Sequence, residues 1–150
     1  MTLETIHVPA ILKTWDAEPH YASPGDAGAD LCAAHDVVLP AGKHALVKTG
    51  VSVALPDGYA LFIHPRSGLA LKNGITVLNS PGTIDSGFRG EIGVILHNTT
   101  DTDFQVNVGN RIAQAVVQRY VRAVFTPVEE LPESERGTDG FGSTGGHASL

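Results

Sequence analysis

Apolar residues recur at every second position in several short segments of the chain. The alternation is clearest in residues 91–96, where Ile92, Val94 and Leu96 fall on one face of an extended backbone. The other segments rich in β-branched or aromatic residues and bounded by glycine, proline or asparagine are residues 44–55, 59–65, 74–78, 103–108 and 111–121. Short strands at this spacing predict an all-β protein, either a sandwich or a barrel.

One segment has the pattern of a helix. Residues 67–74 read SGLALKNG, and we expect Ser67 to be the N-cap and Gly74 to end the helix. A helix of about one or two turns is unstable alone, so it must pack against the strands.

The alternation ends near Thr126. The last residues carry prolines, acids and glycines without a sustained apolar period. An aromatic residue among glycines, Phe141, indicates that this segment closes over something rather than staying disordered. We therefore predict a domain over residues 1–125 and a flexible C-terminal arm over residues 126–150.

Composition and charge argue against a nucleic-acid-binding, secreted or membrane protein. The chain has 150 residues, 10 of them basic and 16 acidic, and a net charge of −6 disfavours binding to a nucleic-acid polymer. Cys32 is the single cysteine, and the N-terminus lacks the charged start and apolar run of a signal peptide. No apolar stretch approaches the roughly 20 residues that span a bilayer. We expect a soluble, cytoplasmic protein with no membrane partner.

Polar segments with glycines interrupt the strands. They are residues 27–31, 65–74, 79–91, 109–114 and 136–146. In the second, Arg66 and Ser67 precede the first turn of the predicted helix, where free backbone N–H groups favour an anion such as phosphate. The alternative is a plain N-cap with Arg66 in solvent.

Residues 79–91 have the turn signals of a hairpin, at Pro81-Gly82 and at Ser86-Gly87. Asp85, between these turns, is either a general base that holds a water molecule or an Asx-turn residue that bonds its own backbone.

Residues 109–114 read GNRIAQ. As a regular strand this segment places Arg111 and Ala113 on one face and Ile112 and Gln114 on the other. A buried Gln114 is either a structural hydrogen-bonding residue or a ligand for a phosphate oxygen. Asp30 is either a loop aspartate satisfied by local N–H groups or a residue that a hydrated ion can approach.

The histidine and cysteine spacings do not predict a zinc site bound by the protein. The sequence leaves open Mg²⁺ held mainly by substrate phosphates.

The polar segments, taken in this order, resemble those of the homotrimeric dUTPase family, the deoxyuridine triphosphate nucleotidohydrolases. The likeness covers residues from about 27 to 145 and rests on PRSGLALKNGI, NSPGTIDSGFRGEI and RGTDGFGSTG. It implies a jelly-roll-like β barrel, a homotrimer, and active sites built from more than one subunit. It also implies hydrolysis of dUTP to dUMP and pyrophosphate, which limits uracil in DNA and supplies dUMP for thymidylate synthesis.

The resemblance also implies residue roles. Asp85 activates the water that attacks the α-phosphate, and Gln114 contacts the α-phosphate oxygens. Mg²⁺ chelates the triphosphate, and Asp30 touches its water shell. The implied substrate-binding residues are Arg66, Ser67, Gly68, Asn79, Thr83, Ile84, Asp85, Phe88, Gly93, Gln114, Arg136, Phe141, Gly142, Ser143 and Thr144.

Among these residues, Asn79 and the backbone from Thr83 to Asp85 read uracil, and Phe141 stacks on the base. Gly93 offers only its backbone, and Arg136, Ser143 and Thr144 bind the γ end of the triphosphate.

Two positions depart from the family pattern. Phe88 stands where tyrosine is usual, so its ring can pack on deoxyribose without the phenolic hydrogen bond. Asp139 stands where glycine is common, and because aspartate tolerates a left-handed backbone we expect a modest effect on arm closure. The alternatives are a dCTP deaminase and a non-catalytic nucleotide-sensing module on the same fold.

Overall fold

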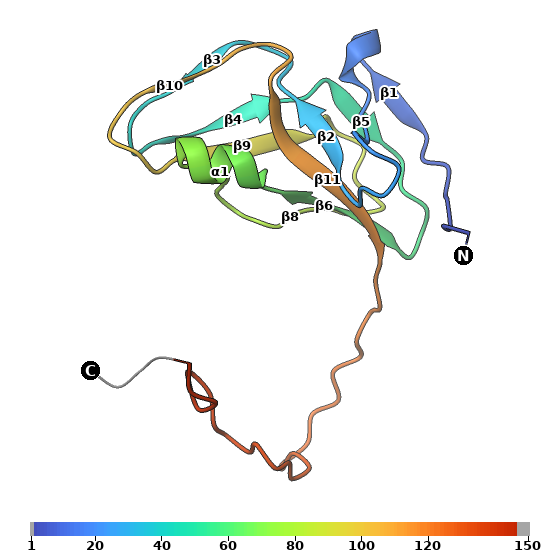
Figure 1. The fold of residues 1–150 in the computed structure, drawn as a ribbon. Helices are drawn as coiled ribbons and strands as arrows, with labels where there is room; N and C mark the ends of the chain where they lie inside the picture. The colour runs from blue at the N-terminus through green and yellow to red at the C-terminus, as the bar shows by residue number, and fades with distance from the viewer. Residues whose placement is uncertain (1, 147–150) are drawn as a thin grey trace.

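The computed structural model describes residues 2–146, and its regular secondary structure is mostly short strands (Figure 1). The strands are β1 (Ala10–Leu12), β2 (Ala29–Cys32), β3 (Val37–Leu39), β4 (His44–Lys48), β5 (Val51–Val53), β6 (Tyr59–His64), β7 (Ile75–Val77), β8 (Gly82–Ile84), β9 (Gly93–Asn98), β10 (Phe104–Val106) and β11 (Arg111–Arg119). A 3₁₀ turn, η1 (Trp15–Ala17), and one helix, α1 (Ser67–Asn73), complete the body. The predicted all-β class with one short helix is confirmed. No described helix has the length and apolar character needed to cross a membrane.

The strands pair antiparallel in four sheets. The largest has the order β2-β11-β6-β8, and a three-stranded sheet has the order β4-β9-β7. The two-stranded sheets are β1-β5 and β10-β3. One apolar core fills the space between them, and it includes the predicted inward residues Ile92, just before β9, and Val94 and Leu96 in β9.

The predicted strand over residues 44–55 is two strands. Thr49 and Gly50 separate β4 from β5, and Gly50 has a φ of +74°, which ends the extended backbone. Strands β1, β2 and β3 had not been predicted, because none has a regular alternation of apolar and polar residues.

The helix forms where it was predicted, but its N-cap residue differs from the prediction. Arg66, not Ser67, is the N-cap residue, and no side chain caps the helix. Gly74 ends the helix as predicted, with a left-handed φ of +63° and its N–H bonded to carbonyls of the last turn.

The hairpin predicted over residues 79–91 is not formed. Its central strand, β8, pairs with β6 instead of with a neighbouring part of its own segment. Gly82 favours this pairing, because a β-carbon at this position would stand 3.3 Å from Ile63 Cβ, a tight contact.

Beyond β11 the chain leaves the body. The Tyr120 N–H donates to Gly58 O at 3.0 Å, and every residue of 121–146 is exposed. Figure 1 shows this C-terminal arm running away from the sheets. The arm therefore begins slightly before the predicted boundary at 125/126, and its last four residues, 147–150, lie outside the described residues.

Candidate functional site

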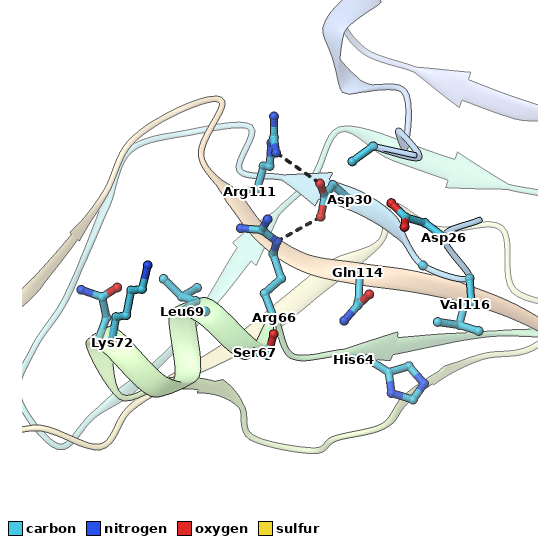
Figure 2. Close-up of a pocket in the computed structure, with 15 residues that line it drawn as sticks. Asp26, Asp30, His64, Arg66, Ser67, Leu69, Lys72, Arg111, Gln114 and Val116 are labelled. Carbon is cyan, nitrogen blue, oxygen red and sulfur yellow. Dashed lines mark hydrogen bonds and ion pairs between the residues drawn. The ribbon is translucent and has the colours of Figure 1, made fainter. Parts of the chain in front are cut away.

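A pocket of about 720 Å³ lies where β2, β11, the end of β6 and the start of α1 meet (Figure 2). Five residues singled out from the sequence line it: Asp30, Arg66, Ser67, Gly68 and Gln114. They come from three separate polar segments, which the antiparallel pairing of β11 with both β2 and β6 brings together.

Asp30 binds two guanidinium groups in this pocket. Its Oδ1 accepts from Arg66 Nε at 3.0 Å, and its Oδ2 lies 3.6 Å from Arg111 Nη1 (Figure 2). The side chain is only 14% exposed. Asp30 is thus a strand residue with two cationic partners, and the expectation of a loop aspartate satisfied by local N–H groups is wrong.

Arg66 is therefore not a solvated N-cap side chain. It uses Nε for Asp30, and its carbonyl accepts the Ala70 N–H at 3.0 Å. Ser67 and Gly68 are the first helical residues, so their N–H groups have no partner within the helix. A β-carbon on Gly68 would meet no heavy atom within 4 Å, which leaves open space beside this backbone.

Gln114 lies half-buried in the middle of β11. Its Nε2 donates to the Pro65 carbonyl oxygen at 3.0 Å, so the structural hydrogen bond considered from the sequence is present. The side chain also lines the pocket, so the role of a phosphate ligand stays a prediction.

The sequence assignment of faces on β11 is wrong. The pairing with β2 shifts register between Arg111 and Ala113, and Ile112 and Ala113 are both buried. The irregularity breaks the strict alternation. As a result Arg111 and Gln114, predicted to face opposite ways, line the same pocket.

Other pocket residues had not been predicted. Lys72 lies one turn along α1 from Gly68, and Arg111 and Asp26 add a cation and a carboxylate. His64 faces Gln114 in the register of β6 and β11, and its Nε2 is buried without a hydrogen-bond partner among residues 2–146. Lys72 could have been predicted, because it lies four residues after Gly68 and therefore on the same face of the expected helix.

The residues expected to read uracil and sugar lie outside this pocket. They are Asn79, Thr83, Ile84, Asp85, Phe88 and Gly93. Strand β8 forms one edge of the four-stranded sheet and β2 forms the other. Asp85 is exposed, and its turn is closed by the backbone bond from Phe88 N–H to Asp85 O at 3.1 Å, with Arg89 Nη1 also donating to Ser86 O and Phe88 O. In the described part of the chain its carboxylate makes no Asx turn.

Two further side-chain contacts stabilise the segment from β8 to β9. The Phe88 ring is 43% exposed and lies against Gly90, where a β-carbon would come within 2.7 Å of the ring. Lys13 Nζ lies 3.1 Å from Glu91 Oε1, and the hydrogen bond from Lys13 lowers the pKa of Glu91.

The predicted arm residues are remote from both groups. Arg136, Phe141, Gly142, Ser143 and Thr144 are exposed, and residues 121–146 form hydrogen bonds only with one another. Arg136 Nε donates to Asp139 O at 2.8 Å. The non-glycine residue with a left-handed backbone is Phe141, at φ +36°, so the left-handed backbone considered for Asp139 is not present there.

Comparison with known proteins gives a consistent result. The sequence pattern of the dUTPase family matches residues 16–145. The chain belongs to the dUTPase family. Among its relatives, the deoxyuridine 5′-triphosphate nucleotidohydrolase of Thermobifida fusca is 62% identical over 131 residues, which are 87% of this chain and 73% of that protein. The same enzyme from Leifsonia xyli is 55% identical over 143 residues, 95% of this chain and 92% of that protein.

Solved structures of dUTPases have the same fold. The dUTPase of Staphylococcus bacteriophage 80alpha with dUpNHpp has a TM-score of 0.84 and 29% identity, over 94% of this chain and 99% of that chain. A mutant of the phage phi11 dUTPase, described with a structural Mg(II) ion, has a TM-score of 0.74 and 26% identity, over 83% and 98%. The predicted jelly-roll-like β fold is thus confirmed.

Proposed function

We propose that this chain is a dUTP diphosphatase, which hydrolyses dUTP to dUMP and pyrophosphate. Membership of the dUTPase family supports the reaction class. The observation that carries the proposal is the pocket that joins Arg66, Ser67, Gly68 and Gln114. In a cell this reaction limits uracil in DNA and supplies dUMP for thymidylate synthesis.

The charge of the pocket suits a triphosphate. Arg66, Lys72 and Arg111 line it, opposed by Asp26 and Asp30. Because Asp30 bonds Arg66 through Nε, the two Nη groups of Arg66 are left for a bidentate contact with phosphate oxygens. The free N–H groups of Ser67 and Gly68 add donors for the same anion.

Asp85, the base expected from the sequence, lies outside the pocket of its own chain, which supports a shared site. We propose a homotrimer in which a second copy presents Asp85 to this pocket. The Asp85 carboxylate takes a proton from water, and the water oxygen bonds to the α-phosphorus. The bond from that phosphorus to the bridging oxygen breaks, and pyrophosphate leaves. Gln114 Nε2 donates its second hydrogen to an α-phosphate oxygen.

Selectivity for deoxyuridine is assigned to the segment around β8. Asn79 and the backbone of Thr83, Ile84 and Asp85 present donors and acceptors to the edge of uracil. The Phe88 ring packs on deoxyribose, leaving no room for a 2′-hydroxyl. Gly93 contributes only its backbone.

The arm completes the site of a neighbouring copy. Phe141 stacks over the uracil ring. Gly142, Ser143 and Thr144 bind near the γ-phosphate, where Arg136 offers a bidentate guanidinium. Closure of the arm excludes water and aligns the nucleophile. The full exposure of Phe141 in a single chain supports this role.

The pocket residues fit Mg²⁺ held mainly by substrate. Residues 2–146 contain no group of three His, Cys, Asp or Glu that could bind a metal, and both Asp30 oxygens already face guanidinium groups. Asp30 would contact only the water shell of the ion. The ion would neutralise phosphate charge in the transition state.

A nucleotide panel with pyrophosphate detection tests the proposed function. With Mg²⁺ we expect turnover of dUTP and little turnover of dTTP, dCTP or UTP. Ammonia release from dCTP would indicate a deaminase instead, and nucleotide binding without turnover would indicate a sensing module. The cytoplasmic location stays a prediction.

A further inference from the structure

Gly28, in the loop that leads into β2, lies directly against the Gln114 side chain. A β-carbon on Gly28 would stand 2.2 Å from Gln114 Oε1, 3.0 Å from its Cδ and 3.2 Å from its Cβ. Its three nearest neighbours therefore belong to one residue. An alanine fits at this position only if Gln114 or the loop moves.

The opposite end of the Gln114 amide is held by the Pro65 carbonyl. Nε2 donates to that oxygen at 3.0 Å. A carbonyl only accepts, so the amide nitrogen must face Pro65 and the amide oxygen must face Gly28. Rotating the amide by half a turn would bring two oxygens together. The Pro65 carbonyl thus sets the orientation of the Gln114 amide, and the missing side chain of Gly28 leaves the space that the amide oxygen occupies.

We propose that Gly28 is a positioning residue for Gln114. The missing side chain at position 28 lets the amide keep the one orientation in which Nε2 bonds Pro65 and still has a second hydrogen for a ligand. The inference rests on the function proposed above, in which that hydrogen is donated to an α-phosphate oxygen. Gly28 has no left-handed φ, so the requirement for glycine is steric rather than conformational.

The loop provides a matched control in Gly25. A β-carbon there would meet no heavy atom within 4 Å, and its φ is not left-handed either. We expect Gly28→Ala to lower kcat/KM for dUTP by about 100-fold, because a displacement of about 1 Å at a reacting centre has an effect of this size. Gly25→Ala should change it by less than about twofold.

Coupling separates positioning from a general effect on the loop. Gly28→Ala should lower kcat/KM much less in a Gln114→Ala background than in the wild type, because the group it displaces is gone. If Gly28→Ala lowers the unfolding temperature, Gln114→Ala should restore it in the double variant. Equal loss of activity in both backgrounds, or a double variant as unstable as Gly28→Ala, would overturn the inference.

A measurement that does not depend on turnover tests the positioning role of Gly28 separately from the proposed function. In ¹⁵N-labelled protein without nucleotide, we expect the Gln114 side-chain amide resonances to shift in Gly28→Ala and to stay in place in Gly25→Ala. Unmoved resonances in Gly28→Ala would refute the positioning role. Absence of dUTP turnover by the wild type would refute only the proposed function.

Discussion

One carboxylate and two guanidinium groups define the electrostatics of the pocket. Asp30 is mostly buried between Arg66 and Arg111, whereas Arg111 is 56% exposed and lies farther from it. Arg66 is therefore the more firmly oriented of the two cations. We infer that Asp30 orients Arg66 for a phosphate ligand, in addition to the role proposed for Asp30 at the water shell of Mg²⁺.

We expect Asp30→Asn to raise KM for dUTP and to lower kcat/KM by about 10- to 100-fold. A hydrogen bond to a charged group contributes about 1.5–3 kcal/mol, and its loss leaves Arg66 less well oriented. Steady-state kinetics measure the effect. Asp101→Asn, at an exposed loop position, is the control. An unchanged KM in Asp30→Asn would contradict the assigned role.

Asp85→Asn should keep nucleotide binding and remove most of the catalysis. The amide cannot accept the proton of the attacking water, and loss of a general base lowers rates by about 100- to 10,000-fold. Calorimetric titration with dUpNHpp, which is not turned over, measures binding separately from kcat. An unaltered kcat would remove Asp85 from the mechanism.

Strands with regular alternation could be predicted from the sequence, and irregular ones could not. β9 was predicted because Val94 and Leu96, two of its three buried residues, are apolar and alternate along the strand. Strand β2 lies in a segment that reads as a polar loop, because Asp30 occupies a strand position facing a functional pocket. On β11 the register shift beside Ile112 depends on pairing with β2, a contact that no local pattern records.

Residues 79–91, the segment around β8, show that strand pairing could not be predicted from turn residues either. The turn predicted at Ser86-Gly87 is present, whereas Gly82 of the predicted Pro81-Gly82 turn begins β8, and the partner strand of β8 is β6, distant along the chain. Turn residues act on the neighbouring backbone, whereas packing of the buried face decides which strand β8 pairs with. The Lys13–Glu91 pair, which ties the end of this segment to the region after β1, was likewise not visible in the sequence.

That pair gives a pH prediction. The pKa of Glu91 is lowered in the folded protein, so its contribution to stability is complete above its ordinary pKa of about 4.5 and is lost as the pH falls through the lowered value. Glu91→Gln should lower the unfolding temperature by about 2 to 4 °C at pH 7 and by less as the pH falls below 4. Glu129→Gln, on the exposed arm, is the control. If Glu91→Gln lowered the unfolding temperature equally at pH 7 and below pH 4, the result would contradict the ion pair.

At the scale of the whole molecule, one chain holds three separated groups. They are the pocket, the segment around β8 at the other edge of the sheet, and the exposed arm. The sequence motifs supplied some residues of each group, but Asp26, Lys72 and Arg111 of the pocket had not been predicted. The separation of the groups within a chain follows from the sheet order, which the motifs do not encode.

The arm can be removed without touching the body. We expect a chain that ends at Glu135 to keep its assembly and to lose about 100-fold in kcat/KM, because closure and alignment are lost. Light scattering measures the assembly, and pyrophosphate release measures the rate. Full activity of the shortened chain would exclude the arm from the mechanism.

The central claim is that the pocket and Asp85 of one active site come from different copies of the chain. Mixed trimers of Arg66→Ala and Asp85→Asn subunits, purified through two different tags, test it directly. Each trimer, whether two-to-one or one-to-two, holds one site with an intact pocket facing an intact Asp85, so we predict about a third of wild-type activity from two inactive parents. Mixed trimers as inactive as the parents would contradict the account.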